Sequence, residues 1–256
     1  MSLSVPTGGR HLPSASLLLA TAAVAWVAVI ALAAGMGSMS TNMDLGLPSF
    51  LGIWLLMMTA MMLPSVTPFA ALYATTLADR RAGRVAALVG GYLVVWTAVA
   101  IPAYCLSRLT DRTVSERPGV ATAITIVIFS ACGIYQLTSF KDRCLVHCRS
   151  PLGTMVKYGE YRGASRDVRV GAHHGLYCVG CCWGLMALLI AFGWMNVVAM
   201  VGLAAAVVIE KTWVHGRQFG RFVGTVALAL AVFALFTPAV APGLDHAPTA
   251  PMSGGM

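Results

Sequence analysis

Two short clusters contain five of the seven cysteines in this chain. The first runs from Cys144 to Cys148 and includes His147, and the second runs from Cys178 to Cys182. Side chains four residues apart share one face of a helix, so a helix here would carry one stripe of His174, Cys178, Cys182 and Met186. Thiolate, thioether and imidazole together suit Cu(I) and Zn(II). The spacing therefore predicts a site for a soft transition metal, with Cu(I) favoured and zinc as the alternative.

The candidate thiol and imidazole ligands are Cys144, His147, Cys148, His174, Cys178, Cys181 and Cys182. A single cysteine in an apolar helix usually serves packing, but three within five residues, preceded by histidine, favour a metal site. Basic residues around the first cluster would lower the pKa of its thiols and favour thiolate, the form that binds metal. Whether the two clusters meet in space is open at this point.

Four methionines form two parallel pairs with a spacing of four residues: Met57 with Met61, and Met58 with Met62. Thioethers bind Cu(I) well and harder ions poorly. The MxxxM spacing resembles the second-helix motif of the eukaryotic high-affinity copper transporters. The alternative is adaptable apolar packing, to which methionine is also suited. A methionine-rich segment just before this helix favours the metal interpretation, and its members are Met36, Met39 and Met43.

Glu210 is the last candidate site residue, because an acid deep in an apolar segment marks a functional site by default. It could supply a carboxylate ligand, accept a proton, or orient a ligating histidine through a hydrogen bond. The adjacent Lys211 also fits a simple interfacial ion pair.

Composition places these residues in an integral membrane protein. Of 256 residues, 58% are hydrophobic and only 10% are charged, whereas soluble domains carry about 25% charged residues. A run of about 20 apolar residues can cross a bilayer. We expect an all-α polytopic transmembrane bundle of about seven spans (six to seven), at residues 15–35, 50–72, 86–107, 120–140, 175–193, 195–211 and 222–241. The fifth and sixth of these spans are divided at Phe192–Asn196, because the apolar stretch 174–211 is too long for one span.

The distribution of basic residues predicts the orientation. With seven spans, 14 of the 17 Lys and Arg residues fall on the side of the N-terminus, and only Arg108, Arg112 and Arg117 fall on the other. Lys and Arg accumulate in cytoplasmic loops, so we expect the N-terminus inside and the C-terminus outside, in a bacterial cytoplasmic membrane. The same bias accounts for the net charge of +8, and nucleic acid is not an expected partner.

Three regions follow from these spans. Residues 1–14 form a cytoplasmic N-terminal segment. Residues 15–241 form the transmembrane bundle, with a basic inner loop at 141–172. Residues 242–256 form a flexible C-terminal tail that contains His246, Met252 and Met256.

The order of these motifs resembles a bacterial family of uncharacterised, predicted metal-binding integral membrane proteins. The resemblance covers about residues 50–215. It rests on the methionine motif at 57–65, on CxxxCRSPL at 144–152, on HGLYCVGCCWGLM at 174–186, and on Glu210-Lys211. It implies a metal-binding membrane bundle and no particular reaction.

The residues predict a transporter or metal-handling protein rather than an enzyme. Methionines would pass Cu(I) across the membrane to the inner Cys/His site, since thiolates hold it more tightly than thioethers. Beside the bilayer and the metal ion, a cytoplasmic or periplasmic metallochaperone is a candidate partner, and a homo-oligomer is compatible with the sequence. Two alternatives stay open: a membrane thiol–disulfide oxidoreductase, or a scaffold or assembly subunit with a structural metal.

Overall fold

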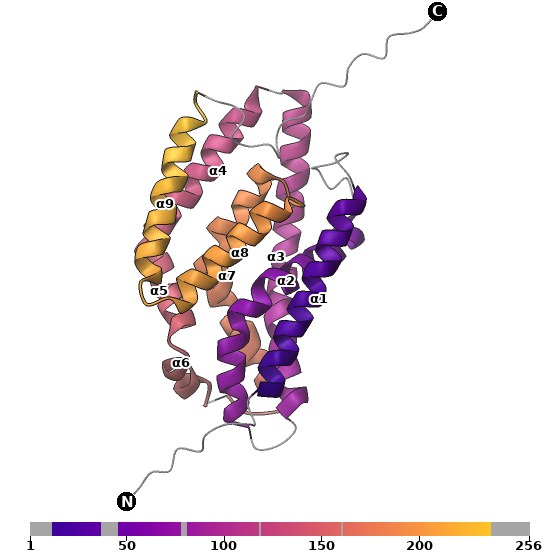
Figure 1. Ribbon diagram of the computed structural model, residues 1–256, viewed down its shortest axis with the longest axis vertical. Coiled ribbons are helices and arrows are strands. Elements are labelled where there is room, and N and C mark those ends of the chain that lie inside the picture. Colours follow the sequence, from indigo (N-terminus) through magenta and orange to yellow (C-terminus); the bar gives the residue numbers. More distant parts are fainter. Residues whose placement is uncertain (1–11, 37–45, 78–80, 118, 160, 237–256) are drawn as a thin grey trace, which may run out of the picture.

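The computed structural model describes residues 12–36, 46–77, 81–117, 119–159 and 161–236, and their regular structure is entirely helical. This confirms the all-α prediction. The helices are α1 (Leu12–Met36), α2 (Leu47–Thr75), α3 (Arg81–Glu116), α4 (Val120–Gln136), α5 (Ser139–Arg149), α6 (Pro151–Tyr158), α7 (Arg166–Phe192), α8 (Val197–Thr212) and α9 (Gly216–Phe233). They form an elongated bundle with most axes along its length (Figure 1).

Four helices, α1, α2, α3 and α7, are long and apolar enough to cross a membrane by length and composition. The bent pair of α4 and α5 raises this number to five if it counts as one span. Large apolar side chains such as Val24, Val27 and Phe222 are 65–70% exposed on the outer surface. This surface is compatible with a protein surrounded by lipid. The expected number of seven spans and the expected orientation stay predictions.

The break predicted between the fifth and sixth spans is confirmed. Helix α7 ends at Phe192, and Gly193 follows with a φ of 94°, which only glycine adopts without strain. The side chain of Asn196 then caps α8 by accepting a hydrogen bond of 3.0 Å from the backbone N–H of Ala199.

The segment 141–172, expected as a basic loop, instead contains most of α5, the whole of α6 and the start of α7. Although this segment is rich in charged residues, its helices are amphipathic, with some side chains buried and others exposed. Cys144 and Leu145 on α5 and Tyr158 on α6 are buried, while the carboxylate of Asp142 bonds the exposed Arg217 of α9 at 2.8 Å. Helix α5 begins at the Thr138 side chain, which accepts from the backbone N–H of Lys141 at 3.3 Å.

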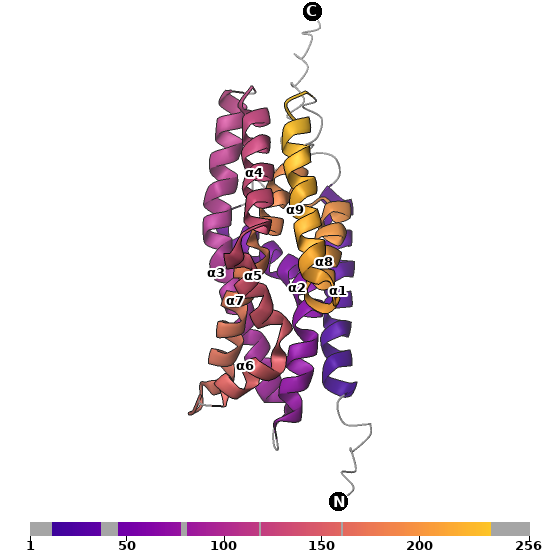
Figure 2. The same cartoon turned by 90° about the vertical axis from the view of Figure 1, so that its left-hand side faces the viewer.

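Helix α7 lies at the centre of the bundle and contacts α3, α4, α5 and α8. Close approach to α3 depends on glycine. A Cβ built on Gly171 would collide with the carbonyl of Leu88, and one built on Gly91 would collide with the carbonyl of Val168. Figure 2 shows α5 and α6 beside the first half of α7, so the first cysteine cluster is carried toward the second.

Candidate metal centre

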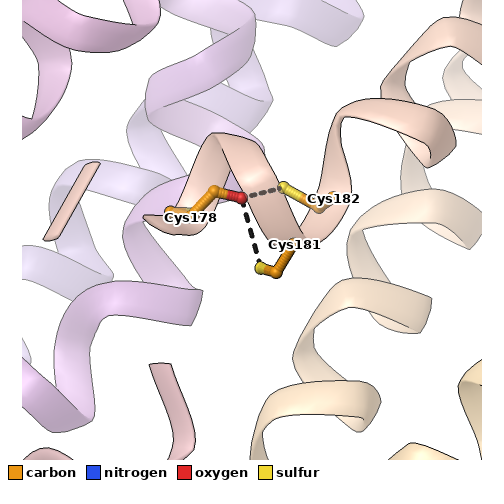
Figure 3. Close-up of side chains that lie close together, drawn as sticks. All are labelled: Cys178, Cys181 and Cys182. Atoms are coloured by element: carbon orange, nitrogen blue, oxygen red, sulfur yellow. Dashed lines mark hydrogen bonds between the residues drawn. The ribbon is translucent and has the colours of Figure 1, made fainter. Parts of the chain in front are cut away.

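Three thiols on α7 form the core of the site (Figure 3). The sulfur atoms of Cys178, Cys181 and Cys182 lie within 4.8 Å of one another, and each residue is at most 1% exposed. The thiols of Cys181 and Cys182 both donate to the backbone carbonyl of Cys178, at 3.2 and 2.9 Å. A three-coordinate ion with metal–sulfur bonds of about 2.3 Å separates its ligand atoms by about 4 Å. The three sulfurs therefore fit one soft ion after small side-chain rotations.

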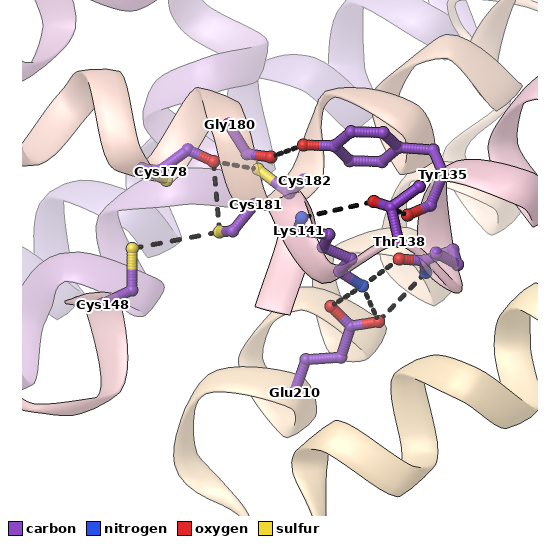
Figure 4. A network of polar contacts seen from close by, with 10 residues as sticks. Tyr135, Thr138, Lys141, Cys148, Cys178, Gly180, Cys181, Cys182 and Glu210 are labelled. Atoms are coloured by element: carbon purple, nitrogen blue, oxygen red, sulfur yellow. Dashed lines mark hydrogen bonds and ion pairs between the residues drawn. The ribbon is translucent and has the colours of Figure 1, made fainter. Parts of the chain in front are cut away.

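The first cysteine cluster meets the second. The sulfur of Cys148 on α5 lies 3.9 Å from the sulfur of Cys181 (Figure 4). Helix α5 approaches this closely because α7 has a glycine at the contact: a Cβ on Gly180 would come within 2.8 Å of the sulfur of Cys144. Cys144 and Cys148 are thus brought beside the α7 cluster.

Polar groups from two further helices contact the sulfur of Cys178. The ammonium group of Lys211 on α8 lies 2.9 Å from its sulfur and also donates to the hydroxyl of Ser65 on α2 at 3.1 Å. The hydroxyl of Tyr92 on α3 lies 3.0 Å from the same sulfur. The sequence did not single out Tyr92, an unremarked aromatic in an apolar helix. For Lys211 the sequence does hold a signal, because a lysine in an apolar segment marks a candidate functional site.

His174 continues the predicted stripe one turn before Cys178. Its ring stacks on Phe69 of α2, with centroids 4.1 Å apart and planes 8° apart, and the residue is 2% exposed. Its Nδ1 atom is buried and has no hydrogen-bond partner among the described residues. A buried ring nitrogen without a partner is costly, and a metal ion would satisfy it. His174 is not among the three residues whose ligand atoms lie within 4.8 Å of one another, so its ligand role stays a prediction.

His147 lies in an aromatic cluster beside the thiols. Its ring stacks on Tyr177 at 3.7 Å, and its Nε2 atom lies 3.1 Å from the hydroxyl of Tyr158. That hydroxyl also lies 2.9 Å from Nδ1 of His173, and burial raises the pKa of Tyr158 above its ordinary value. A surface cavity of about 380 Å³ reaches this cluster; its lining includes Arg143, His147, Ser150, Thr154 and Tyr177.

Glu210 has a partner other than a metal. Both of its carboxylate oxygens accept from the ammonium group of Lys141, at 2.8 and 2.7 Å, and one also accepts from Gln136 at 3.1 Å (Figure 4). Lys141 and Glu210 are each 1% exposed. The pair joins α5 to α8. The carboxylate of Glu210 is therefore engaged in a structural ion pair, and its ligand role stays a prediction.

The four methionines Met57, Met58, Met61 and Met62 are completely buried in α2. Their helix reaches the thiols through Ser65, whose hydroxyl donates to the carbonyl of Met62 at 2.8 Å and accepts from Lys211. Met186 is 5% exposed and lines a cavity of about 200 Å³ with Trp54, Trp96 and Trp194. Met39, Met43 and the tail with His246, Met252 and Met256 lie outside the described residues, as does the side chain of Met36.

Comparison with known proteins gives one result that bears on function. The family model described as "PpoB2: Copper chaperone" matches residues 51–234, a range that includes both cysteine clusters and the buried methionines. Comparisons with curated proteins and with solved structures returned no match. The prediction of a metal-handling family is confirmed, and copper handling agrees with three buried thiols on one helix. The chain belongs to the PpoB2 copper chaperone family.

Proposed function

We propose that this protein holds Cu(I) as cargo at the thiols of Cys178, Cys181 and Cys182 within the membrane, and hands the ion over to another carrier. The observation that carries the proposal is the group of three buried sulfur atoms within 4.8 Å. Membership in a copper chaperone family supports copper as the ion. Thiolates are soft ligands, and Cu(I) is a soft ion that such ligands select.

The surroundings supply further ligands for transfer. Cys148, at 3.9 Å from Cys181, can take over one coordination position, and His174 offers a buried nitrogen without a partner among the described residues. Exchange of one sulfur for another lets Cu(I) move without ever becoming a bare ion in an apolar medium, which would be costly.

The proposed route has two ends. The buried methionines of α2 are the thioether end, linked to the thiols through Ser65 and Lys211. The other end is His147, which precedes Cys148 in the sequence, together with the cavity of about 380 Å³ that His147 lines. Because thiolates bind Cu(I) more tightly than thioethers, transfer from the methionines to the cysteines is downhill. The basic residues of 141–172 support a cytoplasmic position for the cysteine end.

Anaerobic titration tests the proposal. The purified protein in detergent would compete for Cu(I) with a chromogenic chelator, and X-ray absorption would report the ligand atoms. We expect one tightly bound Cu(I) with sulfur neighbours at about 2.3 Å. The triple variant Cys178→Ser, Cys181→Ser, Cys182→Ser should lose at least about a thousandfold in affinity, since hydroxyls are poor Cu(I) ligands.

The matched control is Cys105→Ser, which removes an exposed thiol on α3. This variant should bind Cu(I) as the wild type does. Equal Cu(I) affinity in the triple variant and the wild type would rule out the α7 thiols as the centre.

One observation favours a second function, thiol–disulfide exchange. The sulfurs of Cys148 and Cys181 need to approach from 3.9 Å to about 2.05 Å to form a disulfide. Loss of two protons and of two electrons to an acceptor such as a quinone would complete that bond. A reversible Cys148–Cys181 disulfide found by mass spectrometry, together with no tight Cu(I) binding, would support this function over the first.

A further inference from the structure

Lys211 is a buried cation that has no carboxylate partner among the described residues. It is 8% exposed, and its ammonium group contacts the sulfur of Cys178 at 2.9 Å and the hydroxyl of Ser65 at 3.1 Å. Among the ion pairs of the described residues, the buried acid Glu210 is paired with Lys141, and none includes Lys211. The positive charge of Lys211 is therefore directed at the metal centre and is not neutralised elsewhere.

Two polar side chains from neighbouring helices contact the sulfur of Cys178. The ammonium group of Lys211 donates to it at 2.9 Å, and the Tyr92 hydroxyl lies 3.0 Å away in a contact that either atom could donate. A buried ammonium group is stable only beside an anion or a set of strong acceptors. The sulfur of Cys178 is the acceptor here that can carry a full negative charge.

We infer that Lys211 is a specificity-determining residue that makes this centre prefer monovalent over divalent soft ions. The inference rests on the proposed function, because it requires the ion to bind at Cys178. It goes further, because it states that the ammonium group of Lys211, and not only the thiol ligands, determines which of two equally soft ions binds more tightly.

The reasoning compares two loaded states. Three thiolates with a monovalent ion carry a net charge of −2, and with a divalent ion a net charge of −1. The ammonium group attracts the first complex more strongly by one unit of charge. Both ions displace the same contacts of the empty site, so the cost of disturbing the Lys211–Cys178 contact cancels in the ratio of their affinities.

The size of the effect follows from distance and burial. A metal ion about 2.3 Å from the Cys178 sulfur lies about 5 Å from the ammonium group. One additional unit charge at that distance, in a medium with an effective dielectric constant of about 20, changes an affinity ratio by a factor of ten to several hundred. Because the site is buried, salt should screen this effect little.

The experiment measures the dissociation constants of Cu(I), Ag(I), Zn(II) and Cd(II) for the full-length protein in detergent, under anaerobic conditions. In Lys211→Met, we expect the preference of the site for Cu(I) over Zn(II), and for Ag(I) over Cd(II), to fall at least about tenfold. The Ag(I) and Cd(II) pair separates charge from softness, since both ions are soft. In Lys211→Arg, which keeps the charge, both ratios should stay within about threefold of the wild type.

Two further variants serve as controls. Arg221→Met removes a cation that is 54% exposed and changes the net charge by the same amount, so its ratios should match the wild type. Arg217→Met removes another exposed cation, which is 57% exposed, and should also preserve the ratios.

Unchanged ratios in Lys211→Met, with intact Cu(I) binding, would overturn the inference and leave the proposed function standing. Equal losses for monovalent and divalent ions in both Lys211 variants would also overturn it, because a merely structural residue would act that way. Failure of the wild-type protein to bind any of the four ions would instead overturn the proposed function.

Discussion

Among the side chains that the structure describes, the buried lysines Lys141 and Lys211 lie in contrasting surroundings. Lys141 faces the carboxylate of Glu210 at 2.7 Å, with the Gln136 side chain completing a closed group that joins α4, α5 and α8. Lys211, the next residue after Glu210, turns instead to the thiol of Cys178. The first lysine is neutralised by the protein. The second lies against a thiol, and we infer that its charge acts on the ion that the thiols bind.

The Lys141–Glu210 ion pair offers the most direct test of this contrast. Lys141→Met would leave the Glu210 carboxylate buried without its cation, and removal of one partner of such a pair typically costs about 3–5 kcal/mol. We expect a large loss of stability in detergent, measured by unfolding, while the Cu(I) to Zn(II) preference of the surviving folded protein is unchanged. A stable variant with altered metal preference would reverse the roles assigned to the two lysines.

The double variant Lys141→Met, Glu210→Met tests whether the loss of stability comes from the unpaired carboxylate of Glu210. Apolar replacement of both members of a buried pair is often neutral for stability, so the double variant should recover most of the stability that the single variant loses. Thermal unfolding of both variants in the same detergent measures the recovery. If the double variant bound Cu(I) much more weakly than the wild type, Glu210 would belong to the metal centre after all.

The methionines provide a test of transfer rather than of stability. Met57→Leu together with Met61→Leu conserves volume in a buried helix, and such replacements usually cost less than about 1.5 kcal/mol in stability. We expect loading of the thiols with Cu(I) in proteoliposomes to slow about tenfold, which corresponds to about 1.4 kcal/mol in the barrier. Stopped-flow loading at the wild-type rate would show that these residues only pack.

The smallest effect is expected at Ser65. Ser65→Ala removes one hydrogen bond to Lys211 and one to the carbonyl of Met62, and an ordinary hydrogen bond contributes about 1 kcal/mol. A modest decrease in the unfolding temperature should result, with Cu(I) affinity within a few-fold of the wild type. A fall in the Cu(I) to Zn(II) preference as large as that expected for Lys211→Met would mean that Ser65 positions the ammonium group.

Much of the site could be predicted from the sequence because its central part is local. Cys178, Cys181 and Cys182 lie within about one turn of one helix, so helical geometry alone brings their sulfurs together. The same argument predicted the stripe that starts at His174. The break after Phe192 was also readable, because Gly193 and Asn196 end one helix and begin the next.

Other features escaped prediction because they depend on contacts between distant segments. A basic loop was expected at 141–172, but most of this segment is helical. Its helix α5 is held by contacts that the local sequence does not reveal: ion pairs from Asp142 to α9 and the burial of Cys144 and Leu145. Nothing in the local sequence of Tyr92 marks it as a neighbour of Cys178, 86 residues later. Close passage of α7 past α3 at Gly91 and Gly171 creates that contact.

The sequence by itself determined the helical class, the apolar surface, the three α7 thiols and the metal-handling character, because each depends on composition or on spacing within one helix. The tertiary structure alone decided that Cys148 meets Cys181, that Glu210 is neutralised by Lys141, and that Lys211 faces Cys178. The physical reason is that a buried charge takes its role from its nearest partner in space, and packing between helices chooses that partner.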